Sequence, residues 1–385
     1  MGSATMEDSL LRGPLVLVSL GLFAWSLRCA WRPSSRQTDR WHAFLLSTFL
    51  LVPILGEGLV RLGLACDLEG LRSPDLYGDP FGDDDYWKLK RRGMELAGRN
   101  LDPRLGWVTK TTERNPLGIL RAADYVPQSE NVVLCFGDSF MAGLTPLSHK
   151  IPDHLERALN GPCVYNYGVG GYGVGQIYLR FQDTYPEFEQ PIVVIGILEW
   201  DLDRTLLSLR GAPKPSFRVE GRELVMTAPV LATDAKAWNR EHPPEIRSYL
   251  CALVRRASQR LVDKYMEAPI GYRQAEKCRV NRAVLDRLVH EARQNQLRIL
   301  FVSFPSRTEL DQPGWRSDFL RDTFKELKVP HVDGRPALQQ HIRQSGKEKS
   351  AYFLTDDNHP NSLGNQVLAK AIAERIHLLW RPEGK

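Results

Sequence analysis

The pattern that most constrains this chain is a series of short apolar runs, each followed by a longer helical pattern. The runs begin near residue 131, and four of them are NVVLCF, CVYNY, PIVVIGIL and LRILFVSF. Strands that are apolar on both faces and alternate with helices form a parallel sheet that helices cover on both sides. We therefore predict an α/β domain over residues 131–385 with three layers in the order α/β/α.

One segment, from about 205 to 275, interrupts this rhythm. It contains RGAPKPSF, RVEGRELVM and EHPPE, which are rich in turn-forming and charged residues. We interpret it as an insertion that contains a small hairpin and helices. A final helix, from Ser362 to Leu379, carries an apolar stripe that is expected to dock on the sheet.

Composition excludes several classes of function. The net charge of +5 is small for 385 residues, and basic residues do not form a stripe interleaved with aromatics, so nucleic acid is not an expected partner. The six cysteines are scattered singly and the nine histidines show no HExxH pattern, so we expect no metal and no cofactor. The cysteines are interpreted as small buried residues, with a Cys251–Cys278 disulfide as the alternative.

Two apolar runs near the N-terminus, 13–30 and 43–64, predict membrane helices. The first is close to the roughly 20 residues that cross a bilayer. In the second, Glu57 and Arg61 are four residues apart and would share one helix face. The runs flank a short arginine-rich segment, which stays on the cytoplasmic side. Residues 1–66 are therefore predicted to anchor the protein in a membrane, and 67–130 to form a linker and irregular lead-in to an extracytoplasmic domain.

A candidate nucleophile directly follows the first apolar run, in the tetrapeptide Gly137-Asp138-Ser139-Phe140. Open parallel α/β sheets bind ligands at the carboxyl ends of their strands, which is where Ser139 is expected. A serine hydroxyl is a poor nucleophile unless a base removes its proton. The motif therefore requires a histidine, oriented by an acid, elsewhere in the chain.

Such a pair precedes the last helix, in Asp356-Asp357-Asn358-His359. A carboxylate that holds one ring nitrogen of His359 would fix the tautomer and turn the other nitrogen toward Ser139. Asp356 has a three-residue spacing that suits a tight turn of this kind, and Asp357 is the second candidate. Taken alone, each motif also has a structural interpretation, as a turn or a helix cap.

A glycine-rich segment, Asn166-Tyr-Gly-Val-Gly-Gly-Tyr-Gly173, follows the second apolar run at the same sheet edge. Glycines allow backbone N–H groups to approach closely, and such groups can stabilise a developing oxyanion. The three motifs together indicate acyl transfer through a serine.

GDSF, NYGVGG and DDNHP, in this order, resemble the first, second and fifth conserved blocks of the SGNH (GDSL) hydrolase superfamily. The resemblance covers roughly residues 131–380 and implies a flavodoxin-like fold with ester-hydrolase activity. It implies that Ser139 is the nucleophile and also an oxyanion donor through its N–H, with Gly171 as the second donor. It further implies that Asp356 and His359 complete the triad, and Gly170 is the alternative donor if the register shifts by one.

The resemblance extends loosely upstream. DPRLGW and NPLGIL, together with Glu57 and Arg61 late in the hydrophobic N-terminus, resemble membrane-anchored bacterial members of the superfamily. They favour the same subgroup for this chain.

One block departs from the family pattern. After the third run the family has Gly-x-Asn-Asp, whose Asn side chain is the third oxyanion donor, whereas this chain has Trp200 at the Asn position. The indole N–H of Trp200 either substitutes for the amide or belongs to an apolar wall. Losing one oxyanion donor typically costs about 10²–10³ in turnover. Arg204, shortly after, is expected at the surface.

The favoured function is a membrane-anchored serine esterase that acts on a small-molecule or O-acylated glycan ester of the envelope or extracellular space. An O-acyltransferase would use the same acyl-serine intermediate, and a non-catalytic binding or assembly protein could keep the fold. The glycines from Gly168 to Gly173 also satisfy GxGxxG, with Asp183 and Glu187 downstream. A dinucleotide-binding protein, however, would leave GDSF and DDNHP unexplained.

Overall fold

The chain forms two compact units, which are described separately. The computed structural model describes residues 28, 37–66, 68–90, 100–109, 119–120, 132–231, 234–265, 273–355 and 357–380. One unit comprises residues 1–78 and 244–269, and the other comprises 79–243 and 270–385. These units group the chain differently from the predicted segments 1–66, 67–130 and 131–385, because part of the predicted insertion packs with the N-terminal helix.

A five-stranded parallel sheet forms the centre of the larger unit. Its strands are β3 (Val132–Phe136), β4 (Cys163–Asn166), β5 (Ile192–Leu198), β8 (Arg298–Phe304) and β9 (His331–Asp333). Their spatial order is β4-β3-β5-β8-β9, and every neighbouring pair is parallel. Counted within the sheet this is the flavodoxin-like order 2-1-3-4-5. The predicted α/β fold with a parallel sheet is therefore confirmed.

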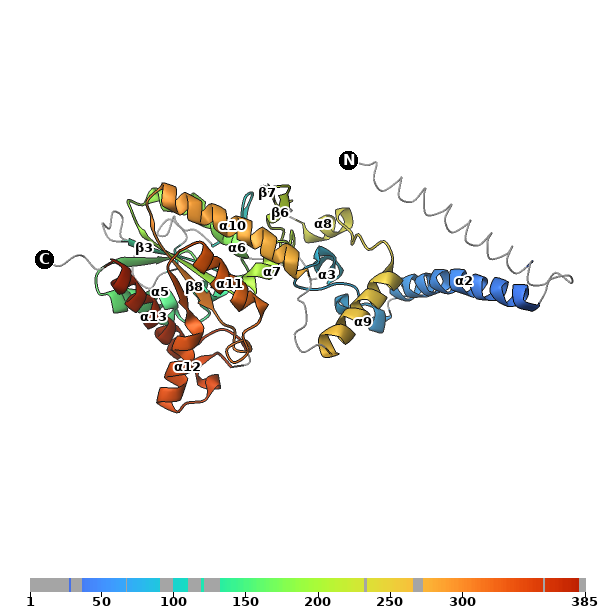
Figure 1. The fold of residues 1–385 in the computed structure, drawn as a ribbon. Helices are drawn as coiled ribbons and strands as arrows, with labels where there is room; N and C mark the ends of the chain where they lie inside the picture. The colour runs from blue at the N-terminus through green and yellow to red at the C-terminus, as the bar shows by residue number, and fades with distance from the viewer. Residues whose placement is uncertain are drawn as a thin grey trace. The chain divides into compact units, whose positions relative to one another are not determined.

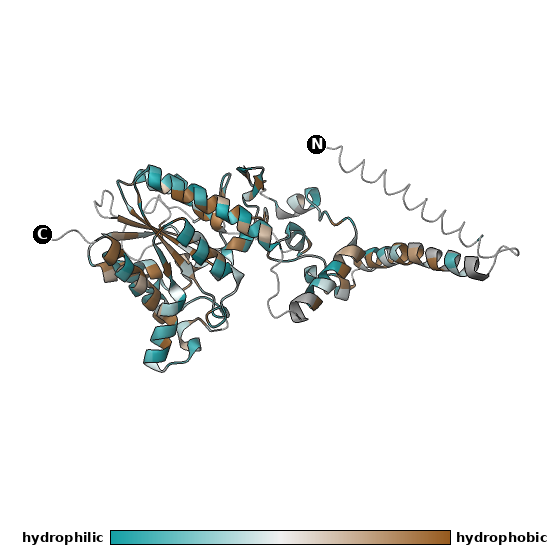
Figure 2. Ribbon diagram, in the orientation of Figure 1, coloured by the Kyte–Doolittle hydropathy of each residue, from teal (hydrophilic) through white to brown (hydrophobic). Residues whose placement is uncertain are grey.

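Helices cover both faces of the sheet, as Figure 1 shows. One face packs against α6 (Val174–Thr184), α10 (Gln274–Gln294) and α11 (Trp315–Glu326). The other face packs against α5 (Ile151–Leu159), α12 (Gly334–Ser345) and α13 (Ser362–Trp380). Apolar residues concentrate on the strands between these layers (Figure 2).

The strands are apolar throughout because each face of the sheet has its own hydrophobic core, and alternate residues of a strand pack into one or the other. In β3, Leu134 and Phe136 pack on the α6 side, whereas Val133 and Cys135 pack on the α5 side. This two-residue alternation follows from the geometry of an extended chain. It accounts for the wholly apolar runs in the sequence.

Shorter elements connect and decorate the sheet. Two antiparallel hairpins are β1 (Asn100–Asp102) with β2 (Gly106–Val108), and β6 (Ser216–Glu220) with β7 (Glu223–Thr227). The second is the hairpin predicted within the insertion. The short helices are α3 (Asp84–Leu89), α4 (Ser139–Ala142), α7 (Asp201–Arg204), α8 (Ala235–Glu241), η1 (Glu69–Leu71), η2 (Pro74–Leu76), η3 (Leu147–His149), η4 (Tyr185–Glu187) and η5 (Lys349–Tyr352).

The smaller unit is built on α2 (Gln37–Ala65) and α9 (Tyr249–Tyr265). Glu57 of α2 caps α9, because its carboxylate accepts hydrogen bonds from the backbone N–H of Leu250 at 2.8 Å and from the Ser248 hydroxyl at 2.8 Å. Arg61 donates to Glu57 at 2.6 Å. The predicted Glu57–Arg61 pair therefore also joins two helices.

The two predicted membrane segments differ in how much of each the structure describes. The first, 13–30, lies outside the described residues except for Arg28. The second, 43–64, falls within α2. None of the helices that the structure describes combines the length and the apolar character that crossing a bilayer requires.

The cysteines that the structure describes are all free thiols. Cys251 and Cys278 are among them, so the alternative disulfide is not formed. Cys135 is fully buried in β3. The described cysteines are therefore unpaired, but Cys66 and Cys251 are exposed, so the interpretation as buried residues is wrong for these two.

Candidate active site

Ser139 and His359 meet at the carboxyl edge of the sheet. Ser139 begins α4 directly after β3, and His359 lies in the loop before α13. The Ser139 Oγ lies 2.8 Å from the His359 Nε2, although the residues are 220 positions apart. The His359 ring also packs against Phe140, with ring centroids 4.8 Å apart. A proton can therefore pass directly from the serine to the imidazole.

Asp357 holds the other nitrogen of His359. Its Oδ1 lies 2.5 Å from the His359 Nδ1 and accepts the His359 backbone N–H at 2.9 Å. Burial raises the pKa of Asp357, but the hydrogen bonds from His359 outweigh it and the pKa is lowered. Asp357 is thus an ionised partner that orients the ring at neutral pH.

The sequence analysis predicted Asp356 as the acid that holds His359, whereas the structure describes this contact for Asp357. Asp356 lies outside the described residues, and Asp357 occupies the position expected for the triad acid. An aspartate can accept a hydrogen bond from the backbone N–H two residues later and so close a turn through its side chain. Asp357 is in this position relative to His359. The same side chain then reaches the imidazole.

Beneath Ser139, the carboxylate of Asp138 fixes the turn that presents the serine. It caps α4 by accepting the Phe140 N–H at 2.8 Å, and Ser139 Oγ lies 3.2 Å from its Oδ2. The Arg204 guanidinium donates to Asp138 at 2.9 Å and to Asp201 at 2.6 Å. The three charged side chains are buried together.

Arg204 corrects a prediction, since a surface arginine was expected and the residue is only 5% exposed. Burial lowers the pKa of Arg204, but the charges of Asp201 and Asp138 raise it by more, so the net pKa is raised. Burial and the neighbouring Asp138 charge raise the pKa of Asp201 well above its usual range. In the sequence, Asp201 and Arg204 are three residues apart, a spacing that places two side chains on the same face of a helix. This spacing could have indicated the ion pair.

The glycine-rich loop is fixed beside Ser139. The Val169 N–H donates to the Gly137 carbonyl at 3.0 Å, and the Trp107 Nε1 donates to the Gly170 carbonyl at 3.2 Å. A trans peptide directs its C=O and N–H in opposite directions, so the Gly171 N–H points away from Trp107. Gly171 has φ +84°, a left-handed conformation that favours glycine. The loop is therefore held beside the turn that carries Ser139, and Gly170 and Gly171 both line the cavity there.

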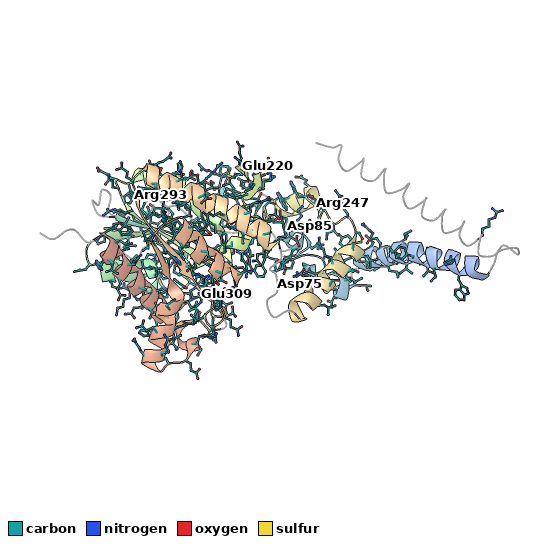
Figure 3. The ribbon with its side chains drawn as sticks, viewed as in Figure 1. Asp75, Asp85, Glu220, Arg247, Arg293 and Glu309 are labelled. Carbon is teal, nitrogen blue, oxygen red and sulfur yellow. The ribbon has the colours of Figure 1, made fainter. Side chains whose placement is uncertain are left out.

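Trp200 forms part of the cavity wall, and its indole N–H is engaged elsewhere. The Nε1 donates to the Glu309 Oε1 at 3.1 Å. Glu309, labelled in Figure 3, lies in the loop after β8, where Ser306 donates to its other oxygen at 2.9 Å. Of the two roles considered for Trp200, the structure therefore favours the wall and not the substitute donor.

The residue before Trp200 is a further buried carboxylate, Glu199. It accepts hydrogen bonds from Ser317 and Arg335. Burial, followed by the charge of Glu309, raises the pKa of Glu199 to about 7, against the opposing effects of Ser317 and Arg335. Sequence reasoning did not find this group, because Arg335 is 136 residues away.

Ser139, His359 and Trp200 border a cavity of about 590 Å³, within the size range of small-ligand sites. Ser139 and His359 lie at its wall. The other lining residues are Trp87, Lys90, Phe140, Gly170, Gly171, Leu198, Trp200, Arg204, Arg210, Gly211, Asp357 and Asn358. The arrangement is a triad of serine, histidine and carboxylate at the wall of a cavity that can hold a ligand.

Comparisons with known proteins give structural neighbours only. No family model and no curated protein matches the chain. The lipase/acylhydrolase from Enterococcus faecalis shares 14% identity, with 66% of this chain and 100% of that chain covered and a TM-score of 0.39. Axe2, an acetylxylan esterase from Geobacillus stearothermophilus, shares 15% identity, with 66% and 97% covered and a TM-score of 0.37. These similarities are too distant to carry an argument about function, which must come from the site.

Proposed function

We propose that this protein is a serine ester hydrolase of the SGNH type. The observation that carries the proposal is the continuous relay from Ser139 Oγ through the His359 ring to Asp357, with contacts of 2.8 and 2.5 Å. A serine with a base that is itself oriented by a carboxylate is the arrangement that makes a hydroxyl nucleophilic. The relay borders a cavity that can admit a substrate.

The proposed reaction has two halves. His359 Nε2 accepts the Ser139 proton while Oγ attacks the acyl carbon, and the protonated ring then gives this proton to the departing alcohol oxygen. In the second half His359 removes a proton from water, which attacks the acyl-serine. The tetrahedral intermediate then collapses, the bond between the acyl carbon and Ser139 Oγ breaks, and the protonated His359 gives its proton to Oγ as the acid leaves. Asp357 stabilises the imidazolium in both halves.

Two backbone groups are proposed as oxyanion donors, the N–H of Ser139 and the N–H of Gly171. The position at which the family pattern has an Asn amide is occupied by Trp200, whose N–H is directed to Glu309. Since one missing donor typically lowers turnover by about 10²–10³, this enzyme should be slower than one with three donors. The relay itself is complete.

The proposed substrate is a small-molecule or glycan ester. Two indole rings, those of Trp87 and Trp200, line the cavity, and flat aromatic surfaces suit the apolar faces of a sugar ring. The cavity volume matches a ligand of one or a few rings. The chemistry within reach of Ser139 is the same for either kind of ester.

Membrane attachment through the N-terminal unit is proposed as well, with the hydrolase domain on the extracytoplasmic side. The support is the sequence pattern and a set of exposed apolar side chains on α2, each more than half exposed: Trp41, Leu45, Phe49, Val52, Leu55, Leu59 and Leu62. An apolar surface of this kind usually contacts a membrane or a protein. Release of the intact chain from membranes by alkaline carbonate alone would refute an integral anchor.

Turnover of 4-nitrophenyl acetate by purified protein tests the proposed reaction. Ser139→Ala should lower kcat by at least about 10³ while the circular dichroism spectrum is unchanged. Ser148→Ala, which removes a hydroxyl from an exposed turn, is the matched control and should retain full activity. Equal activity of Ser139→Ala and wild type would refute the assignment.

A further inference from the structure

Arg204 connects three segments of the active site through one nitrogen of its guanidinium. Its Nη1 donates to Asp138 at 2.9 Å, to the Tyr172 carbonyl at 3.0 Å and to Asp201 at 2.6 Å. Asp138 belongs to the turn that presents Ser139, and Tyr172 belongs to the glycine-rich loop. This side chain therefore joins the nucleophile to the loop that is proposed to hold the oxyanion.

The fit of Arg204 against the glycine-rich loop depends on Gly173. A Cβ on Gly173 would lie 2.8 Å from the Arg204 Cβ, whereas non-bonded carbon atoms are in optimal contact at about 3.5–4.0 Å. Gly168, earlier in the loop, is as close to α4, since a Cβ there would lie 2.4 Å from the Ala142 backbone nitrogen. Two glycines of the loop are therefore required for its close packing against α7 and α4.

The backbone that carries Arg204 is itself held in place. Asn281 of α10 donates to the Leu202 carbonyl at 2.7 Å and accepts the Thr205 hydroxyl at 2.8 Å. The buried Lys214 ammonium donates to the Arg204 carbonyl at 2.8 Å. These bonds make α7 a fixed base from which the guanidinium reaches the site.

Asp138 and Asp201 share the Arg204 donor, and both carboxylates are buried. Charge-assisted hydrogen bonds of this kind are shorter and roughly twice as strong as neutral ones. The Asp138 oxygen that accepts from Arg204 lies 3.2 Å from the Ser139 Oγ, and the other Asp138 oxygen caps α4. A displacement of Asp138 is therefore transmitted directly to the turn that carries the nucleophile.

We propose that Arg204 is a positioning residue that sets the distance between Ser139 and the Gly170–Gly171 segment of the oxyanion loop. The inference rests on the proposed hydrolase function. Arg204 does not react with the substrate and acts through Asp138 and the Tyr172 carbonyl. A displacement of about 1 Å between reacting groups can cost about 10² in rate. Loss of Arg204 should therefore lower kcat and leave KM nearly unchanged.

Two substitutions of Arg204 test this role with 4-nitrophenyl acetate as the substrate. Active sites are first counted by the endpoint of fluorophosphonate labelling, so that kcat refers to folded sites alone. Arg204→Met should lower kcat per site by about 10² and change KM by less than about threefold. Arg204→Lys keeps the charge and has three N–H donors, and should recover at least about tenfold of this loss.

A substitution in the loop tests the same role without removing the arginine. Gly173→Ala should displace the Arg204 side chain and lower kcat per site by at least about tenfold. Gly161→Ala is the matched control, because a Cβ there meets nothing within 4 Å, and it should leave kcat unchanged. Wild-type kcat per site in both Arg204→Met and Gly173→Ala would refute the positioning role.

The inference and the proposed function fail in different ways. A purely structural role of Arg204 would reduce the labelled fraction and the unfolding temperature of Arg204→Met while kcat per labelled site stays at the wild-type value. With turnover that depends on Ser139, this result leaves the hydrolase in place and overturns the positioning role. If wild type shows no turnover that depends on Ser139, the hydrolase proposal fails and the positioning role fails with it.

Discussion

The carboxylate of Asp357 lies 2.5 Å from the Nδ1 of His359 and also accepts the backbone N–H of the same residue. The acid and the base of the relay are therefore held by one short loop. In this contact Asp357 is the group that orients the imidazole.

Asp357→Asn should lower kcat by about 10³–10⁴, because an amide can hold the histidine in the wrong tautomer and cannot stabilise the imidazolium. Asp356→Asn is the matched control and should lower kcat by less than about tenfold. Both variants are compared by steady-state hydrolysis of 4-nitrophenyl acetate. A large loss in Asp356→Asn with a small loss in Asp357→Asn would reverse the assignment.

Replacing Trp200 tests whether the oxyanion site lacks a donor. Trp200→Asn introduces an amide at the position where the family pattern has one, and Trp200→Ala provides the same loss of the ring without a donor. We expect kcat for Trp200→Asn to exceed that for Trp200→Ala by at least tenfold. Equal kcat values for the two variants would show that an amide at this position does not reach the oxyanion.

The stability of the buried ion cluster depends on Arg204. Arg204→Met would leave Asp138 and Asp201 as neighbouring buried carboxylates, which should reduce the free energy of unfolding by about 3–5 kcal/mol. Arg321→Met removes an arginine whose side chain is 62% exposed and should leave the free energy of unfolding nearly unchanged. Urea denaturation measures both. A similar small change in both variants would contradict the role of Arg204.

Glu199 should make stability depend on pH in the acidic range. Its pKa is raised to about 7 by burial and by Glu309, whereas a glutamate in the unfolded chain titrates near 4.5. The folded state therefore binds more protons between these values, and this group's contribution to stability falls as pH rises from about 4.5 to 7. The free energy of unfolding of wild type minus that of Glu199→Gln should decrease across this window. A difference that stays constant across this window would contradict the shift.

The parts of the fold that follow from local sequence patterns were predictable. Wholly apolar runs specify four of the five strands, since such strands are buried on both faces. The fifth, β9, has three half-buried residues and carries too little pattern to be recognised. The position of Ser139 at the sheet edge was also predictable, because Ser139 directly follows the apolar run of β3.

The contacts that determine the finer chemistry join distant segments and leave no local signal. Trp200 and Glu309 are 109 positions apart, and the hydrogen bond between them decides which way the indole N–H points. The pairing of Glu57 with the start of α9 spans 193 positions. The choice between Asp356 and Asp357 depends on the conformation of one loop, which residue spacing alone does not specify.

The most direct test of the central claim is covalent labelling by a fluorophosphonate probe. A nucleophilic serine attacks the phosphorus and retains the probe, so mass spectrometry of peptides should find one adduct, on Ser139. His359→Ala should reduce the labelling rate by at least about 10³, because the base that activates the serine is lost. Absence of an adduct on Ser139 in folded protein, or labelling at the same rate in His359→Ala, would contradict the proposed nucleophile.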